Sequence, residues 1–206
     1  MNESKSLDAG HFSLLEMIKV IYTISGPGNA KGTLIRTGIA TAEECKEVAF
    51  DAIDDYVRSI DELANPIAQF EGQARHYGDG VYGLPLCPFA RSISTFTSVA
   101  GKLPAEYVEV TEKLNEPSGM TDQLRIGAGA AVSPFCGVHQ TVRSKLGSTR
   151  VKVGGKSLVV TQLGCKAASG KKGISQRLCE DACVPTNQVA EILDANMCCY
   201  KVRVEE

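Results

Sequence analysis

Two adjacent glycines, Gly154 and Gly155, separate two short valine-rich runs and place the strongest constraint on the fold. The runs are Arg150–Val153 and Lys156–Gln162. β-Branched residues favour extended backbone, and a glycine pair supplies the positive φ angles that a two-residue hairpin turn requires. We therefore expect an antiparallel hairpin in the C-terminal half, which excludes an all-helical fold.

Helical periodicity dominates the N-terminal half of the chain. Apolar residues recur at helical spacing over Phe12–Ile24, and the glycine- and proline-containing segment 25–29 interrupts the pattern. A Thr-x-x-Glu capping box opens a second predicted helix, Thr41–Leu63, which ends before Pro66. The acidic face of this helix is typical of a solvated surface.

The central segment carries mixed signals. Glycine and aromatic residues over Glu71–Pro88 indicate a loop, which leads into a predicted helix at Pro88–Ala100. Pro104–Leu114 fits either a helix or a strand–helix junction. A proline and a glycine then mark a loop over Asn115–Asp122, where the charge of the chain changes sign.

Three helices are predicted in the C-terminal half. They cover Pro134–Leu146, Ser175–Cys183 and Thr186–Ala195. Thr186 is the expected N-cap of the last one, because a hydroxyl there can accept from the exposed N–H groups of the first turn.

A closing strand is predicted over Cys198–Val204. Alternation along it would place Cys198 and Tyr200 on one face and Cys199 on the other. The elements together predict an α+β fold. Its N-terminal half is helical, and its C-terminal half contains a helix, an antiparallel hairpin, a further helix and the closing strand.

Charge is divided unevenly along the chain. No acidic residue occurs between Gln123 and Cys179, whereas these 57 residues include ten basic ones: Arg125, Arg143, Lys145, Arg150, Lys152, Lys156, Lys166, Lys171, Lys172 and Arg177. We therefore divide the chain into a disordered tail over residues 1–10, an acidic, mainly helical region over 11–122 and a basic, cysteine-rich α+β region over 123–206. The two larger regions are expected to form one globular unit.

Cysteines concentrate in and after the basic segment, where four of them have spacings that suit a metal centre. Cys179 and Cys183 are one helical turn apart, Cys165 lies among glycines, and Cys198 begins the closing strand. Four thiolates suit zinc or an iron–sulfur cluster, so one of these cofactors is expected at the four positions. Four buried structural thiols are the competing interpretation.

Basic residues beside these cysteines would offset the negative charge of a thiolate centre. They are Lys166, Lys171, Lys172 and Arg177. The same side chains would bind an anionic ligand, either a phosphate-bearing small molecule or an acidic protein partner. The expected role is electron transfer, sensing or a structural metal site.

A second hypothesis is a thiol enzyme or a small-ligand-binding domain. Cys136 and His139 are three residues apart in a predicted helix, which puts thiol and imidazole on one face. That pair could serve as nucleophile and base, near Cys87 and the glycine loop Gly78–Gly83. Whether the protein is an enzyme stays open at this point.

A third hypothesis is a basic interaction module. Nucleic acid is disfavoured as its partner, because Phe135 is the only aromatic residue in the acid-free segment and base stacking is poorly provided for. Packing of the basic lobe against acidic helices, in the same chain or in a second copy of a homo-oligomer, explains the charges equally well.

The ends and the hydropathy of the chain favour a cytoplasmic protein. Met1–Gly10 is polar and lacks the basic start and apolar core of a signal peptide. No run approaches 18 consecutive apolar residues, so no membrane span is expected. Cysteines in the reducing cytoplasm are expected to remain thiols.

Overall fold

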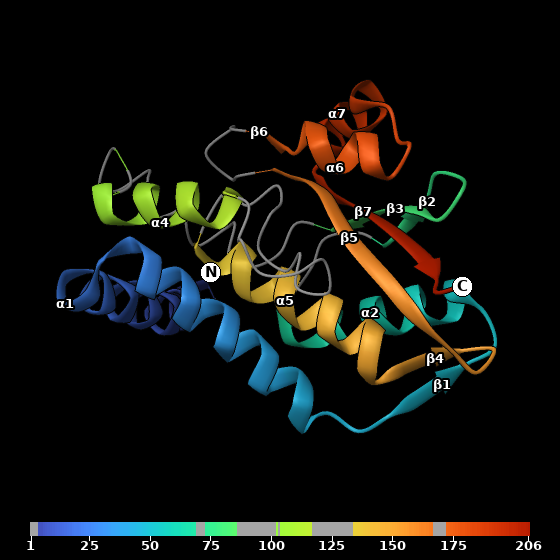
Figure 1. The fold of residues 1–206 in the computed structure, drawn as a ribbon, viewed down its shortest axis with the longest axis horizontal. Coiled ribbons are helices and arrows are strands. Elements are labelled where there is room, and N and C mark those ends of the chain that lie inside the picture. Colours follow the sequence, from blue (N-terminus) through green and yellow to red (C-terminus); the bar gives the residue numbers. More distant parts are fainter. Residues whose placement is uncertain (1–3, 69–72, 86–101, 103, 117–133, 167–171) are drawn as a thin grey trace.

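The computed structural model describes residues 4–68, 73–85, 102, 104–116, 134–166 and 172–206. It has a mixed β-sheet with helices packed on both faces, so the predicted α+β class is confirmed (Figure 1). In chain order the elements are α1 Ser4–Glu44, β1 Val48–Phe50, α2 Ile53–Ala68, β2 Arg75–His76, β3 Val81–Pro85, α4 Ala105–Asn115, α5 Pro134–Thr149, β4 Val151–Val153, β5 Lys156–Lys166, β6 Lys172–Ile174, α6 Gln176–Asp181, α7 Thr186–Asp194 and β7 Met197–Val204.

The sheet combines strands from the acidic and the basic regions of the sequence. Its order is β1-β4-β5-β7-β3-β2, and β6 pairs with the end of β5. β1 runs parallel to β4, and the other described pairs are antiparallel. β5 and β7 lie at the centre and pair from Leu158↔Val204 to Gly164↔Cys199.

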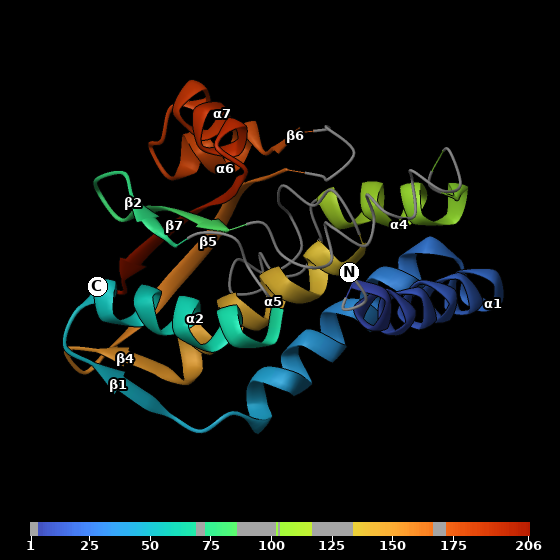
Figure 2. The same cartoon turned by 180° about the vertical axis from the view of Figure 1, so that it is seen from behind.

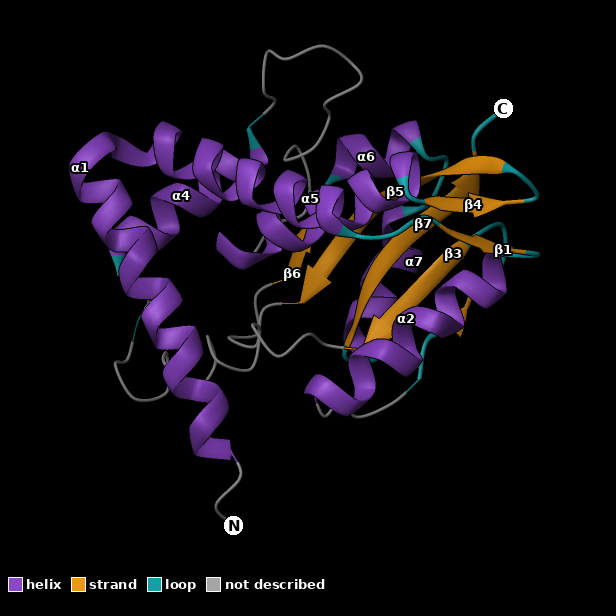
Figure 3. Ribbon diagram, turned by 90° about the horizontal axis from the view of Figure 1, so that it is seen from below, coloured by secondary structure: helices purple, strands orange, loops and turns teal. Residues whose placement is uncertain are grey.

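Different helices cover the two faces of the sheet (Figures 1 and 2). α5 packs on one face, with α1 and α4 outside it, and α2 lies on the same side. α6 and α7 pack on the opposite face. Seen from below, α1 and α4 lie farther from the sheet than α5 does (Figure 3). We call the two sides the α5 face and the α7 face.

The predicted hairpin is present. β4 and β5 pair with Val153 opposite Lys156, and the turn between them consists of Gly154 and Gly155. Their φ angles are 56° and 81°, values at which a residue with a side chain would be strained. The glycine pair therefore fixes the register of the hairpin, as its sequence indicates.

The C-terminal helices occur where expected, with different ends. Ser175 caps α6, because its Oγ accepts a hydrogen bond from Leu178 N at 3.4 Å. The N-cap of α7 is Pro185 and not Thr186, which is already the first helical residue. α5 continues beyond the predicted end at Leu146 to Thr149, one residue short of the position that precedes β4.

The single helix predicted over Thr41–Leu63 is wrong in its first half, whereas α2 confirms a helix from Ile53 onward. Thr41 lies inside α1, where its hydroxyl donates to the Thr37 carbonyl at 2.9 Å and opens no new helix. The chain then forms β1 before α2 begins. β1 exists because it pairs with β4, and Val48 N donates to the Arg150 carbonyl at 2.8 Å. A partner far along the chain thus overrides the local helical pattern.

The loop prediction for Glu71–Pro88 is also wrong in part. This segment contains β2 and β3, and all five residues of β3 are buried beside β7. The segment Pro104–Leu114, for which the sequence allowed a helix or a strand–helix junction, forms the helix α4. The helix predicted at Pro88–Ala100 and most of the charge boundary within Asn115–Asp122 lie outside the described residues.

The predicted interruption over residues 25–29 appears as a kink and not as an end of the helix. Gly26 has φ 79° and ψ 172°, with Pro27 after it, and α1 resumes beyond. α2 likewise continues past Pro66, where a stop was expected. None of the helices in the described ranges has both the length and the apolar character that crossing a membrane requires.

Candidate functional site

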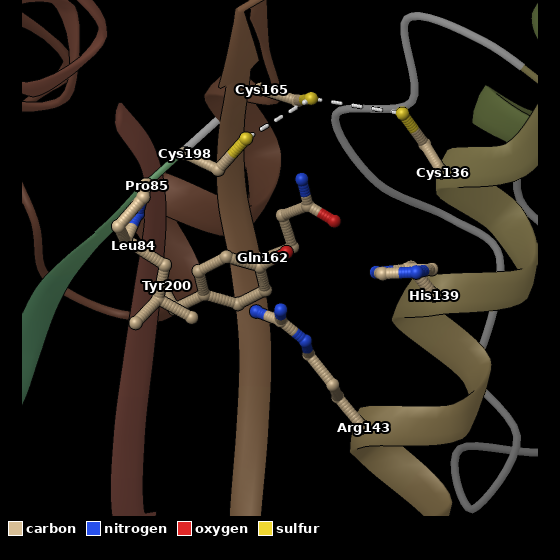
Figure 4. Close-up of a pocket in the computed structure, with 9 residues that line it drawn as sticks. All are labelled: Leu84, Pro85, Cys136, His139, Arg143, Gln162, Cys165, Cys198 and Tyr200. Atoms are coloured by element: carbon tan, nitrogen blue, oxygen red, sulfur yellow. Dashed lines mark hydrogen bonds between the residues drawn. The ribbon is translucent and has the colours of Figure 1, made fainter. Parts of the chain in front are cut away.

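A small cavity lies between α5 and the sheet (Figure 4). Its volume is about 10 Å³, roughly the space that one water molecule needs. The residues that line it come from four elements: Leu84 and Pro85 of β3, Cys136, His139 and Arg143 of α5, Gln162 and Cys165 of β5, and Cys198 and Tyr200 of β7. None of these described lining residues is acidic.

Three thiols at the cavity form what we call the thiol row: Cys136, Cys165 and Cys198. Cys165 Sγ lies 3.6 Å from Cys136 Sγ and 3.4 Å from Cys198 Sγ, so it occupies the middle. The three side chains are 6 %, 1 % and 3 % exposed, respectively. Hydrogen bonds to its two neighbours, together with burial, raise the pKa of the Cys165 thiol well above its usual range. Cys165 is therefore a neutral thiol at neutral pH.

A β-bulge in β5 turns Cys165 toward α5. Gln162 faces α5, and the next paired residue, Gly164, lies opposite Cys199. The extra residue, Leu163, packs in the α7-face core, which Gly164 also faces. Cys165 consequently returns to the α5 face. Without the bulge, strict alternation would direct its thiol to the opposite side of the sheet.

The bulge requires a glycine at position 164, because α7 packs so closely against this part of β5 that a side chain would not fit. A Cβ at this position would lie 2.6 Å from both Leu193 Cδ1 and Val189 Cγ1 of α7. Such a contact would displace α7 or remove the bulge. A glycine inside a strand thus determines where Cys165 points.

His139 lies one helical turn after Cys136 and lines the same cavity. Burial, followed by the positive charge of Arg143, lowers the pKa of His139 to about 3. The imidazole is therefore neutral at neutral pH. A neutral imidazole is the form that coordinates a metal ion, and it is a poor proton acceptor when its pKa is this low.

Arg143 brings a positive charge to the cavity from the next turn of α5. Its Cζ lies 4.6 Å from the centre of the Tyr200 ring, a cation–π contact that joins α5 to β7. A cation beside thiols favours their ionised form, because the negative charge of a thiolate is offset locally.

Gln162 is the most deeply buried amide at the cavity, with 6 % of its surface exposed. Figure 4 shows its amide extending from β5 into the space between the thiol row and His139. Its Oε1 accepts no hydrogen bond in the described part of the chain. A buried acceptor without a donor destabilises the fold, so this oxygen identifies a place where a bound donor would be favourable.

The structure does not bring the four predicted cysteine ligands together. Cys165 and Cys198 belong to the thiol row, whereas Cys179 packs with Cys199 in the core of the α7 face. Burial, with the neighbouring thiols, raises the pKa of Cys199 to about 12. Cys183 is exposed, with a φ of 53° just after α6. The physical reason is that α6 covers the sheet face opposite α5, so its cysteines cannot reach the cavity.

No ready-made metal centre is present among the described residues. Within these ranges, no group of three or more His, Cys, Asp or Glu side chains is placed to hold a metal ion. The thiol row is extended, with Cys165 between the other two sulfurs, which do not face a common point (Figure 4). Cys87 lies outside the described residues.

Among the predicted basic residues, Arg177 belongs to α6 and therefore lies on the α7 face, away from the thiol row. Lys166 and Lys172 are opposite each other in the β5–β6 ladder, and Lys171 lies outside the described residues. Arg177 is exposed and lies 3.9 Å from the Asp181 carboxylate. The cation at the cavity is Arg143, seven residues after Cys136 on α5.

The sequence patterns did not identify three polar or aromatic side chains at the cavity, Arg143, Gln162 and Tyr200, or the apolar pair Leu84 and Pro85. Two signals were available. Helical periodicity from Cys136 and His139 extends to Arg143, and an isolated glycine inside a predicted strand, as at Gly164, is typical of a bulge.

Comparison of the chain with protein-family descriptions, with curated proteins and with solved structures found no match. The function is therefore inferred from the cavity and the side chains that line it.

Proposed function

We propose that the protein binds a single zinc ion through Cys136, Cys165 and Cys198. The observation that supports this is the contact of Cys165 of β5 with both Cys136 of α5 and Cys198 of β7, all three thiols being buried. Thiolates are preferred ligands of zinc in proteins. A zinc ion at this position would tie the main helix of the α5 face to the two central strands.

The sulfur separations are close to those of a zinc–thiolate centre. With Zn–S bonds of about 2.3 Å in a tetrahedron, neighbouring sulfurs lie roughly 3.8 Å apart. The two contacts of Cys165 measure 3.6 and 3.4 Å. Binding would require the two outer sulfurs to turn toward a common point. One side-chain torsion per cysteine controls that movement.

The charge of the cavity suits three thiolates and one divalent ion. Zn²⁺ with three thiolates carries one negative charge, and the guanidinium of Arg143 carries one positive charge beside it. A buried charged centre is tolerable only when it is paired in this way. The described lining residues contain no carboxylate, which argues against Mg²⁺ or Ca²⁺.

The size of the cavity favours one ion over an iron–sulfur cluster. Its volume of about 10 Å³ suits a single ion or water molecule, and a cluster core of several iron and sulfur atoms needs more room. The ligand set also differs from the one expected from spacing. It keeps Cys165 and Cys198, and Cys136 takes the place of Cys179 and Cys183.

The protonation states favour metal binding over a Cys136–His139 nucleophile pair. Such a pair requires the imidazole to accept the thiol proton and remain charged. Burial and Arg143 hold the pKa of His139 near 3, which disfavours the imidazolium form. Metal binding needs no imidazolium, because the thiol protons leave to solvent as the ion binds.

Elemental analysis of the full chain, purified anaerobically in the presence of a thiol reductant, tests this proposal. We expect about one zinc per chain, in keeping with a single thiolate site. Cys165→Ser, at the centre of the row, should lose the metal. Cys183→Ser removes an exposed cysteine away from the row and should retain it.

Three outcomes would overturn the proposal. The first is native-like wild-type protein, with all thiols reduced, that binds no zinc when zinc is added. The second is stoichiometric iron with sulfide, which would indicate a cluster. The third is loss of zinc from Cys183→Ser while both Cys165→Ser and Cys165→Ala retain it. Two substitutions of Cys165 are tested in case one of them misfolds.

A further inference from the structure

The thiol row places one cysteine in contact with two others, and this arrangement suits disulfide chemistry. Cys165 Sγ lies 3.4 Å from Cys198 Sγ and 3.6 Å from Cys136 Sγ. An S–S bond is about 2.05 Å long, so either pair would have to close by roughly 1.5 Å. A partial rotation about a side-chain torsion can supply this movement. Cys165 can therefore form a bond with either neighbour, and the reaction needs no bound ion.

The order of the three sulfurs suits the transfer of a disulfide along the row. Figure 4 shows Cys165 between the other two, with Cys136 of α5 on one side and Cys198 of β7 on the other. In thiol–disulfide exchange one sulfur attacks a disulfide sulfur, and the former partner of that sulfur leaves. The attacking and the leaving sulfur therefore lie on different sides of the central one. Cys165 occupies that central position.

Cys136 is the thiol of the row best placed to react with an oxidant. It is the third residue of the 16-residue helix α5, and the positive end of a helix favours negative charge on a nearby sulfur. It also has the largest exposed fraction of the three, 6 % against 1 % for Cys165 and 3 % for Cys198. A row this deeply buried favours a very small oxidant, and hydrogen peroxide has only two heavy atoms.

We propose that the thiol row is a site of reversible oxidation by hydrogen peroxide, in which Cys136 reacts first and Cys165 forms the disulfide. The Cys136 sulfur bonds to one peroxide oxygen, the O–O bond breaks, and the thiol proton leaves with the other oxygen as water. The product is a sulfenic acid. The Cys165 sulfur then bonds to the Cys136 sulfur, and the hydroxyl leaves with the Cys165 proton as a second water. Two thiols lose two electrons in total, and these electrons reduce the peroxide to two water molecules.

Cys198 receives the bridge in a second step. Its sulfur attacks Cys165 within the first disulfide, a Cys165–Cys198 bond forms, and Cys136 leaves as a thiol with the proton that Cys198 gives up. This exchange involves no net oxidation. The first bridge joins α5 to β5, whereas the second joins the neighbouring strands β5 and β7. Oxidation would thus connect elements that only non-covalent contacts hold together in the reduced protein.

This inference goes beyond the proposed zinc site and does not depend on it. Disulfide formation needs only the sulfurs, and it is tested on metal-free protein. The proposed ion and the disulfide would use the same sulfurs, so they exclude each other. Cys45 and Cys183 provide a contrast, because both are exposed and neither belongs to the thiol row. They separate the effect of access to the oxidant from the effect of a neighbouring thiol.

Disulfide mapping by mass spectrometry tests the proposal on the metal-free, fully reduced chain. Wild type is treated with an equimolar amount of hydrogen peroxide beside a chain carrying Cys45→Ser and Cys183→Ser, which lacks these two exposed thiols. Both proteins should lose two thiols and contain Cys165 bonded to Cys136 or to Cys198. Cys198→Ser should stop the reaction at the Cys136–Cys165 bridge.

Substitution of Cys165 separates the first step from the second. Cys165→Ser should form no bridge in the row and should accumulate the sulfenic acid on Cys136, which dimedone labels. Cys165→Ala should behave in the same way, and it serves if the serine variant misfolds. Cys199→Ala is the matched control, because Cys199 is a buried neighbour of Cys198 that packs on the α7 face. It should form the same bridges as wild type.

Three outcomes would overturn the proposal. A bridge that omits Cys165, such as one from Cys136 to Cys198 or to Cys87, would remove its central role. A Cys165–Cys198 bridge that forms at the wild-type rate in Cys136→Ser would show that Cys136 is not the reacting thiol. Folded wild-type protein that retains all three row thiols in peroxide would exclude the site. Zinc binding is measured separately on reduced protein, so its failure leaves the oxidation site unaffected.

Discussion

Both faces of the sheet bury cysteines, but the two groups lie in different surroundings. On the α5 face, the thiol row borders the side chains of His139, Arg143 and Gln162. On the α7 face, Cys179 and Cys199 pack among aliphatic side chains. Burial of a cysteine therefore does not identify a functional site in this protein. The polar side chains beside the thiol row are what distinguish this candidate site from the cysteines of the α7 face.

The contrast is sharpest at two consecutive residues of β7. Cys198 faces the cavity and Cys165, whereas Cys199 faces the other core and is fully buried. A cysteine in an apolar layer behaves as a small hydrophobic residue, and its raised pKa keeps it inert. One step along a strand thus separates a candidate ligand from a packing residue.

Gly164→Ala should have a large effect on both faces of the sheet. Gly164 faces α7, and the bulge at this position directs Cys165 toward α5. The new Cβ would meet Leu193 and Val189 at 2.6 Å. We expect a loss of about 2–3 kcal/mol in the free energy of unfolding, typical of overpacking. Zinc binding should weaken as well, since relief of the clash moves Cys165. Urea unfolding and zinc titration measure the two effects.

Gly28→Ala is the control for this substitution. Gly28 lies in α1, and a Cβ there would meet nothing within 4 Å. Alanine in a helix interior is favoured over glycine by up to about 1 kcal/mol, so the control should be neutral or stabilising. A stable Gly164→Ala protein with normal zinc affinity would show that the bulge does not position Cys165.

Exchanging the two adjacent cysteines of β7 for serine, one at a time, would sharpen the comparison. Cys198→Ser should lower the zinc affinity by a factor of 100 or more, on the order expected when a ligand is lost. Cys199→Ser should bind zinc normally. It should instead destabilise the metal-free protein by about 1–3 kcal/mol, because a hydroxyl enters an apolar layer.

Zinc competition with a chromophoric chelator and urea unfolding would separate these two responses. Equal zinc affinities in Cys198→Ser and Cys199→Ser would contradict the assignment of the zinc ligands to the α5 face alone. Loss of zinc from Cys199→Ser alone would transfer the site to the α7 face.

Several features of the α5 face follow from local sequence patterns. The glycine pair predicts the hairpin that contains β5, and alternation in β7 predicts that Cys198 and Tyr200 share a face, as they do. The three-residue spacing of Cys136 and His139 predicts one helix face. These patterns succeed because each depends on residues close together in the chain.

Other features depend on contacts that local patterns do not encode. β1 is a three-residue strand whose existence depends on pairing with β4. Cys179 and Cys183 have ligand-like spacing, but α6 packs on the face away from the cavity. The orientation of Cys165 depends on one extra residue in β5, Leu163, since a single bulge reverses the side of every residue beyond it.

His139 is expected to give the protein an acid sensitivity that originates on the α5 face. Its pKa is about 3 in the folded chain and about 6.5 in an unfolded one. Between these values the unfolded chain binds a proton that the folded chain does not. The stability is therefore complete above pH 6.5 and decreases as the pH falls toward 3, by at most about 1.4 kcal/mol per pH unit.

His139→Gln should flatten this dependence in metal-free protein, measured by urea unfolding at a series of pH values from 4 to 8. His76 provides the control, because it is exposed on β2, and His76→Gln should keep the wild-type slope. Metal-free protein is needed because acid also releases zinc from thiolates. An unchanged slope in His139→Gln would mean that another group carries the acid response. The folded protein would then not hold the His139 imidazole neutral beside the thiol row.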